Sequence, residues 1–157
     1  MTDDDLLALY ERTVEELYRY ASRLTGGDRA WADELVQDTY LAVLKRIRAG
    51  VDEPVDVGWL IVSCRHRFLD QIKQDRRSRA RERRAAPPEP THDAQGHAID
   101  ALAEVPAEHR AALVLRYLDD LTVNDVAREL NRSVRATESL LARARTSLRL
   151  VLAQGAN

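Results

Sequence analysis

The chain has 157 residues, enough for one domain of ordinary size or two small ones, and it is rich in Leu, Ala, Arg and Glu with only 5% aromatic residues, which favours an all-α fold. A single cysteine excludes an internal disulfide, no apolar run is long enough to span a membrane, and the acidic first residues lack the features of a signal peptide, so we expect a cytoplasmic protein. The net charge of −2 conceals local charges of −6 over residues 1–60, +6 over 61–84, −5 over 85–109 and +3 over 110–157, which indicates different partners for different segments.

Three helices are predicted in residues 1–84. The first ends at Gly26, and its apolar stripe, with spacings of three and four, is Leu7, Tyr10, Val14, Leu17, Ala21 and Leu24. Asp28 is placed to cap the second helix, and the third starts at Trp59. The third helix loses its apolar stripe in the arginine-rich segment 75–84, where we expect it to leave the core.

A linker separates these helices from a second helical unit. Residues 85–96 hold three prolines and lack apolar residues able to form a core, which indicates a flexible connection. We therefore predict two small helical domains, residues 1–84 and 98–157, joined by a linker over residues 85–97. The second domain opens with a helix that begins at Pro106. Each domain is small enough to be only marginally stable by itself.

The second domain contains the pattern of a helix-turn-helix over residues 121–145. Thr122 and Ser133 are placed to cap two short amphipathic helices, with a tight turn at Asn131-Arg132 between them. In this motif the second helix lies in the major groove of DNA. The sequence therefore predicts a duplex-binding unit.

The second helix of that motif has two distinct faces. The face predicted to pack on the preceding helices holds Val134, Thr137, Leu141, Ala144 and Leu148. The opposite face holds the candidate contacts to duplex DNA, which are Arg132, Ser133, Arg135, Ala136, Ser139 and Arg143. Arginine can bind a guanine edge through two hydrogen bonds or contact phosphate. The alternative is a solvated arginine face on an ordinary bundle helix.

The basic third helix is a second candidate nucleic-acid surface. Its polar and charged residues that recur along one side and its edges are Arg65, His66, Asp70, Lys73, Arg76 and Arg77. Such a surface suits a groove that follows a single-stranded backbone. A solvated helix end or an RNA-contacting tail is the alternative, and Trp59 favours a core position over a base-stacking one.

The second helix carries an acidic face with an apolar centre. Its members are Asp33, Glu34, Gln37, Asp38 and Leu41. A solvated face is the usual explanation of this pattern, but such a face also suits docking of a basic helical partner.

Residues for catalysis or for a cofactor are not grouped in the sequence. Cys64 and His66 have no second pair of ligands nearby, so a metal site is not expected. No Ser-His-Asp grouping, phosphate-binding glycine loop or HExxH motif occurs. We expect a protein without a cofactor that is not an enzyme.

Three segments, in this order, resemble the extracytoplasmic-function (ECF) type of sigma factor of bacterial RNA polymerase. Residues 33–44 are similar to the family's polymerase-binding helix and residues 59–70 to its −10-element helix. Residues 105–110, with the helix-turn-helix, are similar to its −35-reading domain. The resemblance covers residues 6–152 and implies two helical domains that direct promoter recognition, melting of the −10 element and transcription initiation.

The resemblance also implies roles for the three candidate surfaces. The acidic face would bind the clamp of the largest catalytic subunit of core RNA polymerase, the basic helix would hold the melted −10 strand, and the helix-turn-helix domain would sit on the polymerase flap and read the −35 duplex. An anti-sigma factor that holds the protein inactive is a further implied partner. The chain departs from the family at His66, where Asn is frequent, and at Glu138 and Leu140, where a basic residue is frequent.

Two other classes of protein compete with this interpretation. A helix-turn-helix regulator that acts without polymerase explains the second domain but leaves the acidic face and the basic helix unexplained. Such regulators commonly dimerise, whereas no sustained heptad repeat is evident here, and we expect a monomer when the chain is free. Gel filtration discriminates the two. A helical-bundle enzyme lacks any clustered catalytic groups.

Overall fold

The computed structural model describes residues 1–77 and 101–155, and the side chains of residues 75–77 lie outside that description. The elements are α1 (Asp3–Thr25), α2 (Arg29–Arg48), α3 (Val57–Arg77), α5 (Ala107–Leu113), the π-helical turn η1 (Val114–Leu118), α6 (Val123–Leu130) and α7 (Val134–Gly155). The described residues hold helices and no strand, so the all-α prediction is confirmed. No described helix has both the length and the apolar character that crossing a bilayer requires.

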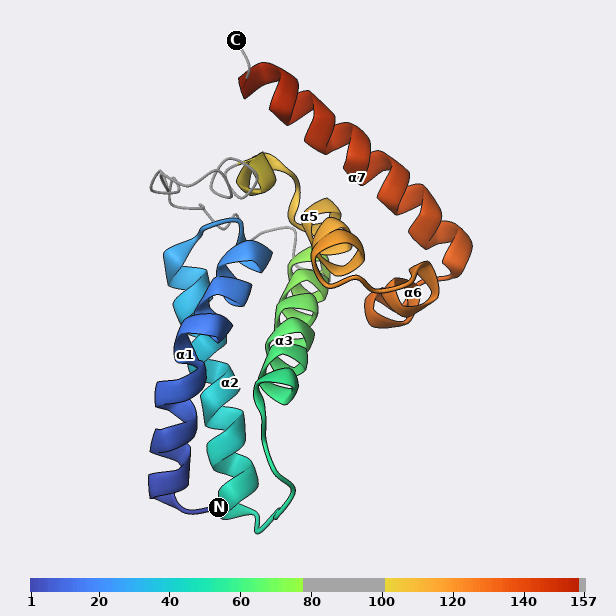
Figure 1. The fold of residues 1–157 in the computed structure, drawn as a ribbon. Helices are drawn as coiled ribbons and strands as arrows, with labels where there is room; N and C mark the ends of the chain where they lie inside the picture. Colours follow the sequence, from blue (N-terminus) through green and yellow to red (C-terminus); the bar gives the residue numbers. More distant parts are fainter. Residues whose placement is uncertain (78–100, 156–157) are drawn as a thin grey trace.

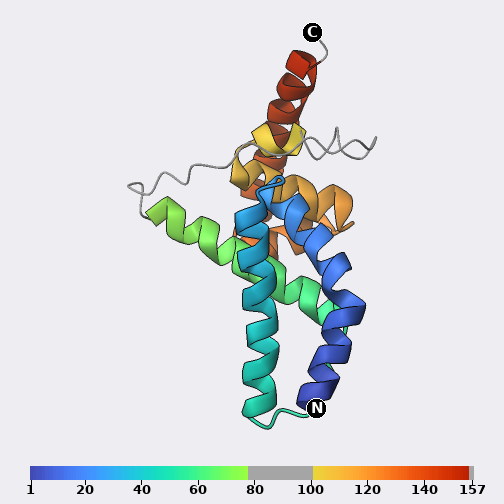
Figure 2. The same ribbon diagram turned by 90° about the vertical axis from the view of Figure 1, so that its left-hand side faces the viewer.

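The first half of the chain, residues 1–77, forms three helices (Figures 1 and 2). α1 and α2 run antiparallel side by side, and α3 crosses them at an angle. Gly26 ends α1 in the left-handed conformation, with φ of 65°. The Asp28 side chain accepts a hydrogen bond from the Trp31 N–H at 3.1 Å, which confirms the predicted cap of α2. α3 begins at Val57, two residues earlier than predicted.

The buried face of α1 differs from the predicted stripe at its beginning. Leu7 and Tyr10 are 57% and 44% exposed, whereas Leu9 and Thr13 are buried. Burial of the polar Thr13 is possible because its hydroxyl donates to the Leu9 carbonyl at 2.6 Å and lies 2.8 Å from the Tyr40 hydroxyl. Apolar periodicity alone does not detect a buried threonine of this kind. The face of α1 that is buried in its first turns is therefore different from the predicted one.

The second half, residues 101–155, contains the predicted helix-turn-helix. The Thr122 hydroxyl accepts a hydrogen bond from the Asp125 N–H at 3.1 Å, and the Ser133 hydroxyl accepts one from the Ala136 N–H at 3.1 Å. Asn131 adopts the left-handed conformation between α6 and α7, with φ of 54°. The two caps and the tight turn are therefore confirmed.

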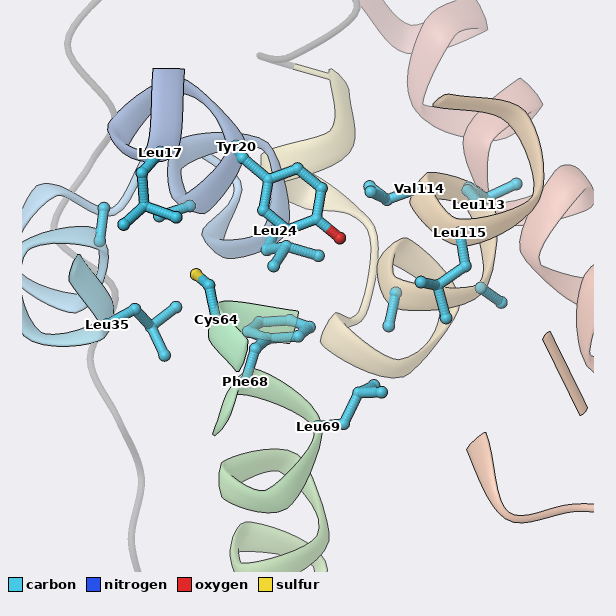
Figure 3. Close-up of a cluster of buried hydrophobic side chains, with 14 of the residues drawn as sticks. Leu17, Tyr20, Leu24, Leu35, Cys64, Phe68, Leu69, Leu113, Val114 and Leu115 are labelled. Atoms are coloured by element: carbon cyan, nitrogen blue, oxygen red, sulfur yellow. The ribbon is translucent and has the colours of Figure 1, made fainter. Parts of the chain in front are cut away.

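A single hydrophobic core crosses from one half to the other (Figure 3). Tyr20, Leu24 and Phe68 face the turn that carries Val114 and Leu115. The buried side chains of the two predicted helical domains form one continuous cluster. Pooling the two halves buries apolar area that either half alone would leave exposed to water. The predicted boundaries at 84 and 97 and the linker between them lie outside the described residues.

Arg110 from α5 connects the second half to the end of α1. Its Nε donates to the Leu24 carbonyl at 2.8 Å, and its Nη1 donates to the Leu102 carbonyl at 3.2 Å. A Cβ atom at Gly26 would lie 2.5 Å from Arg110 Nη1 and 2.7 Å from Ala103 Cα. The backbones of the two halves approach here as closely as a glycine permits.

Gly26→Ala is therefore expected to destabilise the chain far more than Gly50→Ala. Both glycines have positive φ, which costs a residue with a Cβ about 1 kcal/mol. Only at Gly26 would the added Cβ also clash with backbone, so the free energy of unfolding of the Gly26→Ala variant should be about 3 kcal/mol lower than that of the wild type. Urea denaturation of both variants measures the difference, and equal losses would contradict the close approach of the two halves.

Candidate polymerase-binding and nucleic-acid surfaces

The outer face of α7 presents most of the predicted contacts to duplex DNA. Ser133, Arg135, Ser139 and Arg143 are exposed, and Ala136 is half-buried. Ser133 also caps the helix, so its hydroxyl fixes the position of the first turn. The small side chains between the arginines leave room for a close approach to base edges.

The inner face of α7 differs from the prediction at two positions. Thr137, Leu141 and Ala144 are buried as predicted, but Val134 is 42% exposed. Leu140 is only 1% exposed, so it belongs to the core of the helix-turn-helix. This burial explains why position 140 holds an apolar residue.

Arg132 differs from the other predicted DNA contacts. Its guanidinium forms an ion pair with Glu108 of α5, and its side chain is only 20% exposed. Arg132 therefore joins the turn of the helix-turn-helix to the preceding helix, and this contact must be released or shared before the side chain binds DNA.

The residues of the predicted −10 surface on α3 differ in their exposure to solvent. His66 and Asp70 are exposed and Lys73 is half-buried, as expected of a ligand-binding side. Arg65 departs from the expectation because it is only 7% exposed and points into the molecule. The side chains of the remaining two predicted contacts lie outside the described residues; they are Arg76 and Arg77.

Arg65 belongs to a triad with Tyr20, which is also buried, and Asp119, which is partly buried. The Tyr20 hydroxyl donates to Asp119 Oδ2 at 2.7 Å, and Arg65 Nη1 lies 3.7 Å from the same oxygen. Burial raises the pKa of the Asp119 carboxyl, while Tyr20 and Arg65 oppose that rise. Burial, with the nearby carboxylate, also raises the pKa of Tyr20, so its hydroxyl stays protonated as the donor. The sequence does not predict this triad, because no periodic pattern connects Asp119 with Tyr20 and Arg65, which are far from it along the chain.

A second polar contact joins α3 to α6 at the edge of the triad. His66 Nε2 lies 3.1 Å from Glu129 Oε2, with the histidine side chain 56% exposed. Two adjacent residues of the predicted −10 surface, Arg65 and His66, therefore both contact acidic side chains of the second half.

The acidic face on α2 is free of the core, as its predicted role requires. Asp33, Glu34 and Gln37 are exposed, Asp38 is half-buried, and Leu41 is 51% exposed at the centre. Beneath them, the buried residues of α2 are Ala32, Leu35, Val36, Thr39 and Val43. The polar face and the packed face are thus cleanly separated.

Trp59 and Cys64 are structural residues. Trp59 packs at the edge of the core, with Arg46 Cζ 5.1 Å from its ring centroid. Cys64 is buried, and that burial raises the pKa of its thiol to about 12. Within residues 1–77 and 101–155, no three His, Cys, Asp or Glu side chains are grouped so that they could hold a metal ion.

Comparison with known proteins assigns each half of the chain to a family. The model of Sigma-70 region 2 matches residues 9–78, and that of Sigma-70, region 4 matches residues 98–148. The two matches define the class as transcription initiation factors of the sigma-70 type.

Relatives along nearly the whole chain specify the group. The ECF RNA polymerase sigma factor SigL of Mycobacterium tuberculosis is 30% identical over 155 residues, which covers 92% of this chain and 87% of SigL. SigM of Bacillus subtilis is 25% identical, covering 100% of this chain and 99% of SigM. The chain belongs to the ECF sigma factors of RNA polymerase.

A solved structure shares the fold. The sigma factor RpoE from Bartonella quintana, crystallised with the anti-sigma factor NepR, superposes with a TM-score of 0.61 at 21% identity. The match covers 94% of this chain and 96% of RpoE.

Cys64 should react very slowly with thiol reagents in the folded chain. A pKa raised from 9.0 to about 12 lowers the thiolate fraction at pH 8 by roughly a thousandfold, and the thiolate is the reactive species. Ellman's reagent at pH 8, with and without 8 M urea as the unfolding control, measures this protection. Reaction at the same rate in both conditions would contradict the burial of Cys64.

Proposed function

We propose that this chain binds core RNA polymerase, brings it to promoters with a −10 and a −35 element, and catalyses no reaction itself. The observation that carries the proposal is the arginine face of α7, exposed on a helix whose other side is buried in a helix-turn-helix. Family membership supports polymerase as the partner, and because polymerase works in the cytoplasm, we propose that location for this chain.

The acidic face of α2 is the proposed contact to the polymerase core. Asp33, Glu34, Gln37 and Asp38 surround Leu41, so a partner can bury an apolar centre inside a charged ring. This arrangement is complementary to a basic helical pair, and we assign it to the clamp of the largest catalytic subunit.

The exposed side of α3 is the proposed contact to the melted −10 strand. His66, Asp70 and Lys73 offer hydrogen-bond donors and acceptors to unstacked bases and phosphates. Arg76 and Arg77 extend the basic charge of the same helix, and Arg65 joins this surface only if its pairing with Asp119 is released.

The exposed face of α7 is the proposed reader of the −35 duplex. Arg135 and Arg143 are eight positions apart, about two turns of helix, with Ser139 midway between them. Arginine at such positions contacts guanine edges or phosphates, and the small Ala136 and Ser139 permit close approach. Ser133, at the start of the helix, is the proposed contact to the DNA backbone, and Arg132 joins it when its ion pair with Glu108 is released or shared.

We further propose that an anti-sigma factor holds the chain inactive. An apolar groove of about 680 Å³ lies between α1, η1 and α7, where Leu118, Leu148 and Leu152 form part of its wall. Arg23, Arg145 and Arg149 also line it. An amphipathic helix with acidic edges fits both the apolar wall and these charges.

Run-off transcription tests the proposed function directly. Purified core polymerase with this chain, on a pool of genomic promoter fragments, should give discrete start sites that core polymerase alone does not give. Absence of transcripts with duplex binding retained would favour the polymerase-independent regulator instead.

Arg135→Ala combined with Arg143→Ala should reduce transcription from a −35-dependent promoter at least about tenfold, because each good arginine–base contact contributes about 1–3 kcal/mol. Core binding should be unchanged. Arg12→Ala with Arg19→Ala, which removes the same charge from exposed positions of α1, is the matched control. Loss of core binding in the Arg135 and Arg143 variant would refute the assignment of this face.

Asp38→Arg should weaken core binding at least about tenfold, because it places a positive charge against a basic partner. The fold should be retained, since Asp38 lies at the edge of the exposed face. Pull-down with core polymerase, compared with Glu11→Arg on α1, measures the effect. Equal retention of both variants would refute clamp docking through α2.

A further inference from the structure

His109 of α5 lies at the end of the arginine face of α7. Arg135, Ser139, Arg143 and Ser147 follow one another at every fourth position, so they form one stripe along the helix. The first three are exposed, and the half-buried Ser147 has its Oγ 2.9 Å from His109 Nδ1. The imidazole therefore continues the stripe beyond Arg143, although it belongs to a different helix.

The stripe is too long to lie wholly on base edges. Arg135 and Ser147 are twelve positions apart, which corresponds to about 18 Å along the helix axis. The major groove is about 12 Å wide, so a helix that presents Arg135 to base edges brings Ser147 to the phosphates at the rim of the groove. His109 therefore lies at the level of the DNA backbone, where a hydrogen-bond donor is the group that a phosphate requires.

The contact with Ser147 orients the imidazole and leaves its second nitrogen available. Among the residues that the structure describes, none is hydrogen-bonded to Nε2 of His109. A serine hydroxyl both donates and accepts, so Ser147 can hold Nδ1 whether the ring is neutral or protonated. When Nδ1 accepts from the hydroxyl, or when the ring is protonated, Nε2 carries a proton that it can donate to a phosphate oxygen.

Burial and a nearby charge favour the neutral imidazole in the free chain. Burial, and then the guanidinium of Arg143, lower the pKa of His109 from its ordinary value. Glu108, the acidic neighbour of His109 on α5, forms an ion pair with Arg132. A phosphate bound beside Arg143 would offset the positive charge of that guanidinium and place a negative charge near the ring. Binding of DNA therefore favours the protonated form of His109.

We propose that His109 is a further contact of this chain to duplex DNA, in which Nε2 donates to a backbone phosphate beside Arg143 and Ser147 positions the ring. This inference rests on the proposed role of α7 in reading the −35 duplex. The contact carries no base specificity. It makes duplex binding tighter as the pH falls, because the complex takes up a proton at His109 that the free chain lacks.

The pH dependence of duplex binding tests this contact. Fluorescence anisotropy of the free chain with a labelled mixed-sequence duplex is suitable, since a phosphate contact is not sequence-specific. His109→Gln keeps a hydrogen-bonding group beside Ser147 but cannot be protonated. Between about pH 8 and about pH 6 the affinity of the wild type should increase at least about threefold more than that of His109→Gln. Ser147→Ala, which frees the ring, should show a smaller increase than the wild type.

The salt dependence of the affinity separates a phosphate contact from a structural role. Each phosphate contact through a positive charge steepens the plot of log affinity against log salt concentration by about 0.9. At about pH 6 the slope for His109→Gln should therefore be shallower than that of the wild type by about this amount, and at about pH 8 the two slopes should agree. Equal slopes at the lower pH would overturn the contact.

Arg12→Gln is the matched control for net charge. It removes one positive charge from an exposed position of α1, far along the chain from α7. Its affinity should increase between the two pH values as much as that of the wild type, and its slope should be that of the wild type. An equally shallow slope in Arg12→Gln and His109→Gln would overturn the contact, because net charge alone would then explain the effect. Circular dichroism confirms the fold of each variant.

Run-off transcription distinguishes failure of this contact from failure of the proposed function. Discrete start sites with the wild type, together with a His109→Gln affinity that follows the wild type at every pH, would overturn the contact and leave the proposed function standing. The predicted difference in pH dependence without transcripts would support the contact and refute the proposed function. If the free chain does not bind the duplex, the same comparison is made with its complex with core polymerase. A ratio of wild-type to His109→Gln affinity that does not change with pH would then overturn the contact.

Discussion

The Asp119 carboxylate is the contact on which the arrangement of the two halves depends. It accepts a hydrogen bond from Tyr20 and faces Arg65, so three polar groups from α1, α3 and the end of η1 meet at the edge of the hydrophobic core. Buried polar groups of this kind tolerate few alternative geometries, because any shift leaves one of them without a partner. Apolar contacts supply the tendency to associate, and the triad selects one way of associating. The energetic cost of the buried charges makes that choice specific without making it strong.

Local backbone features bring Asp119 to this position. The π-helical turn at residues 114–118 ends with the Asp119 N–H donating to the Val114 carbonyl at 2.9 Å. Such a turn adds one residue to the helical repeat, which rotates the following side chain relative to an α-helix. At the other edge, Gly26 lets Arg110 reach the Leu24 carbonyl. The π-helical turn in the second half and the left-handed Gly26 in the first half therefore both position residues for the contact between the halves. Both features occur at the ends of helices, where the backbone can depart from α-helical geometry.

Much of the local structure was predictable from the sequence, whereas the contact between the halves was not. Caps at Asp28, Thr122 and Ser133 depend on side chains within three residues of their partners, so the sequence reveals them directly. The burial of Arg65 depends on an acid 54 positions away, which no periodic pattern indicates. Leu140 shows the same limit on a smaller scale. The sequence pattern assigned it to neither face of the helix, whereas packing against the neighbouring helices buries it almost completely. The predicted faces of α2 and α7 are largely exposed in the structure. Apolar periodicity identifies the packed side of each helix, and the opposite side is then left to solvent.

The division of charge along the chain connects folding with function. The basic segment that includes the end of α3 is followed by acidic and then mildly basic segments, so the chain carries its own counter-charges to the surface proposed for DNA. At the start of α3, Asp119 and Glu129 supply those counter-charges to Arg65 and His66. These two basic side chains therefore contribute to the contact between the halves of the chain. The positive charge that remains accessible to solvent, on α3 at Lys73 and on α7 at Arg135 and Arg143, is not used in this contact, and it is the charge that the proposed function assigns to nucleic acid.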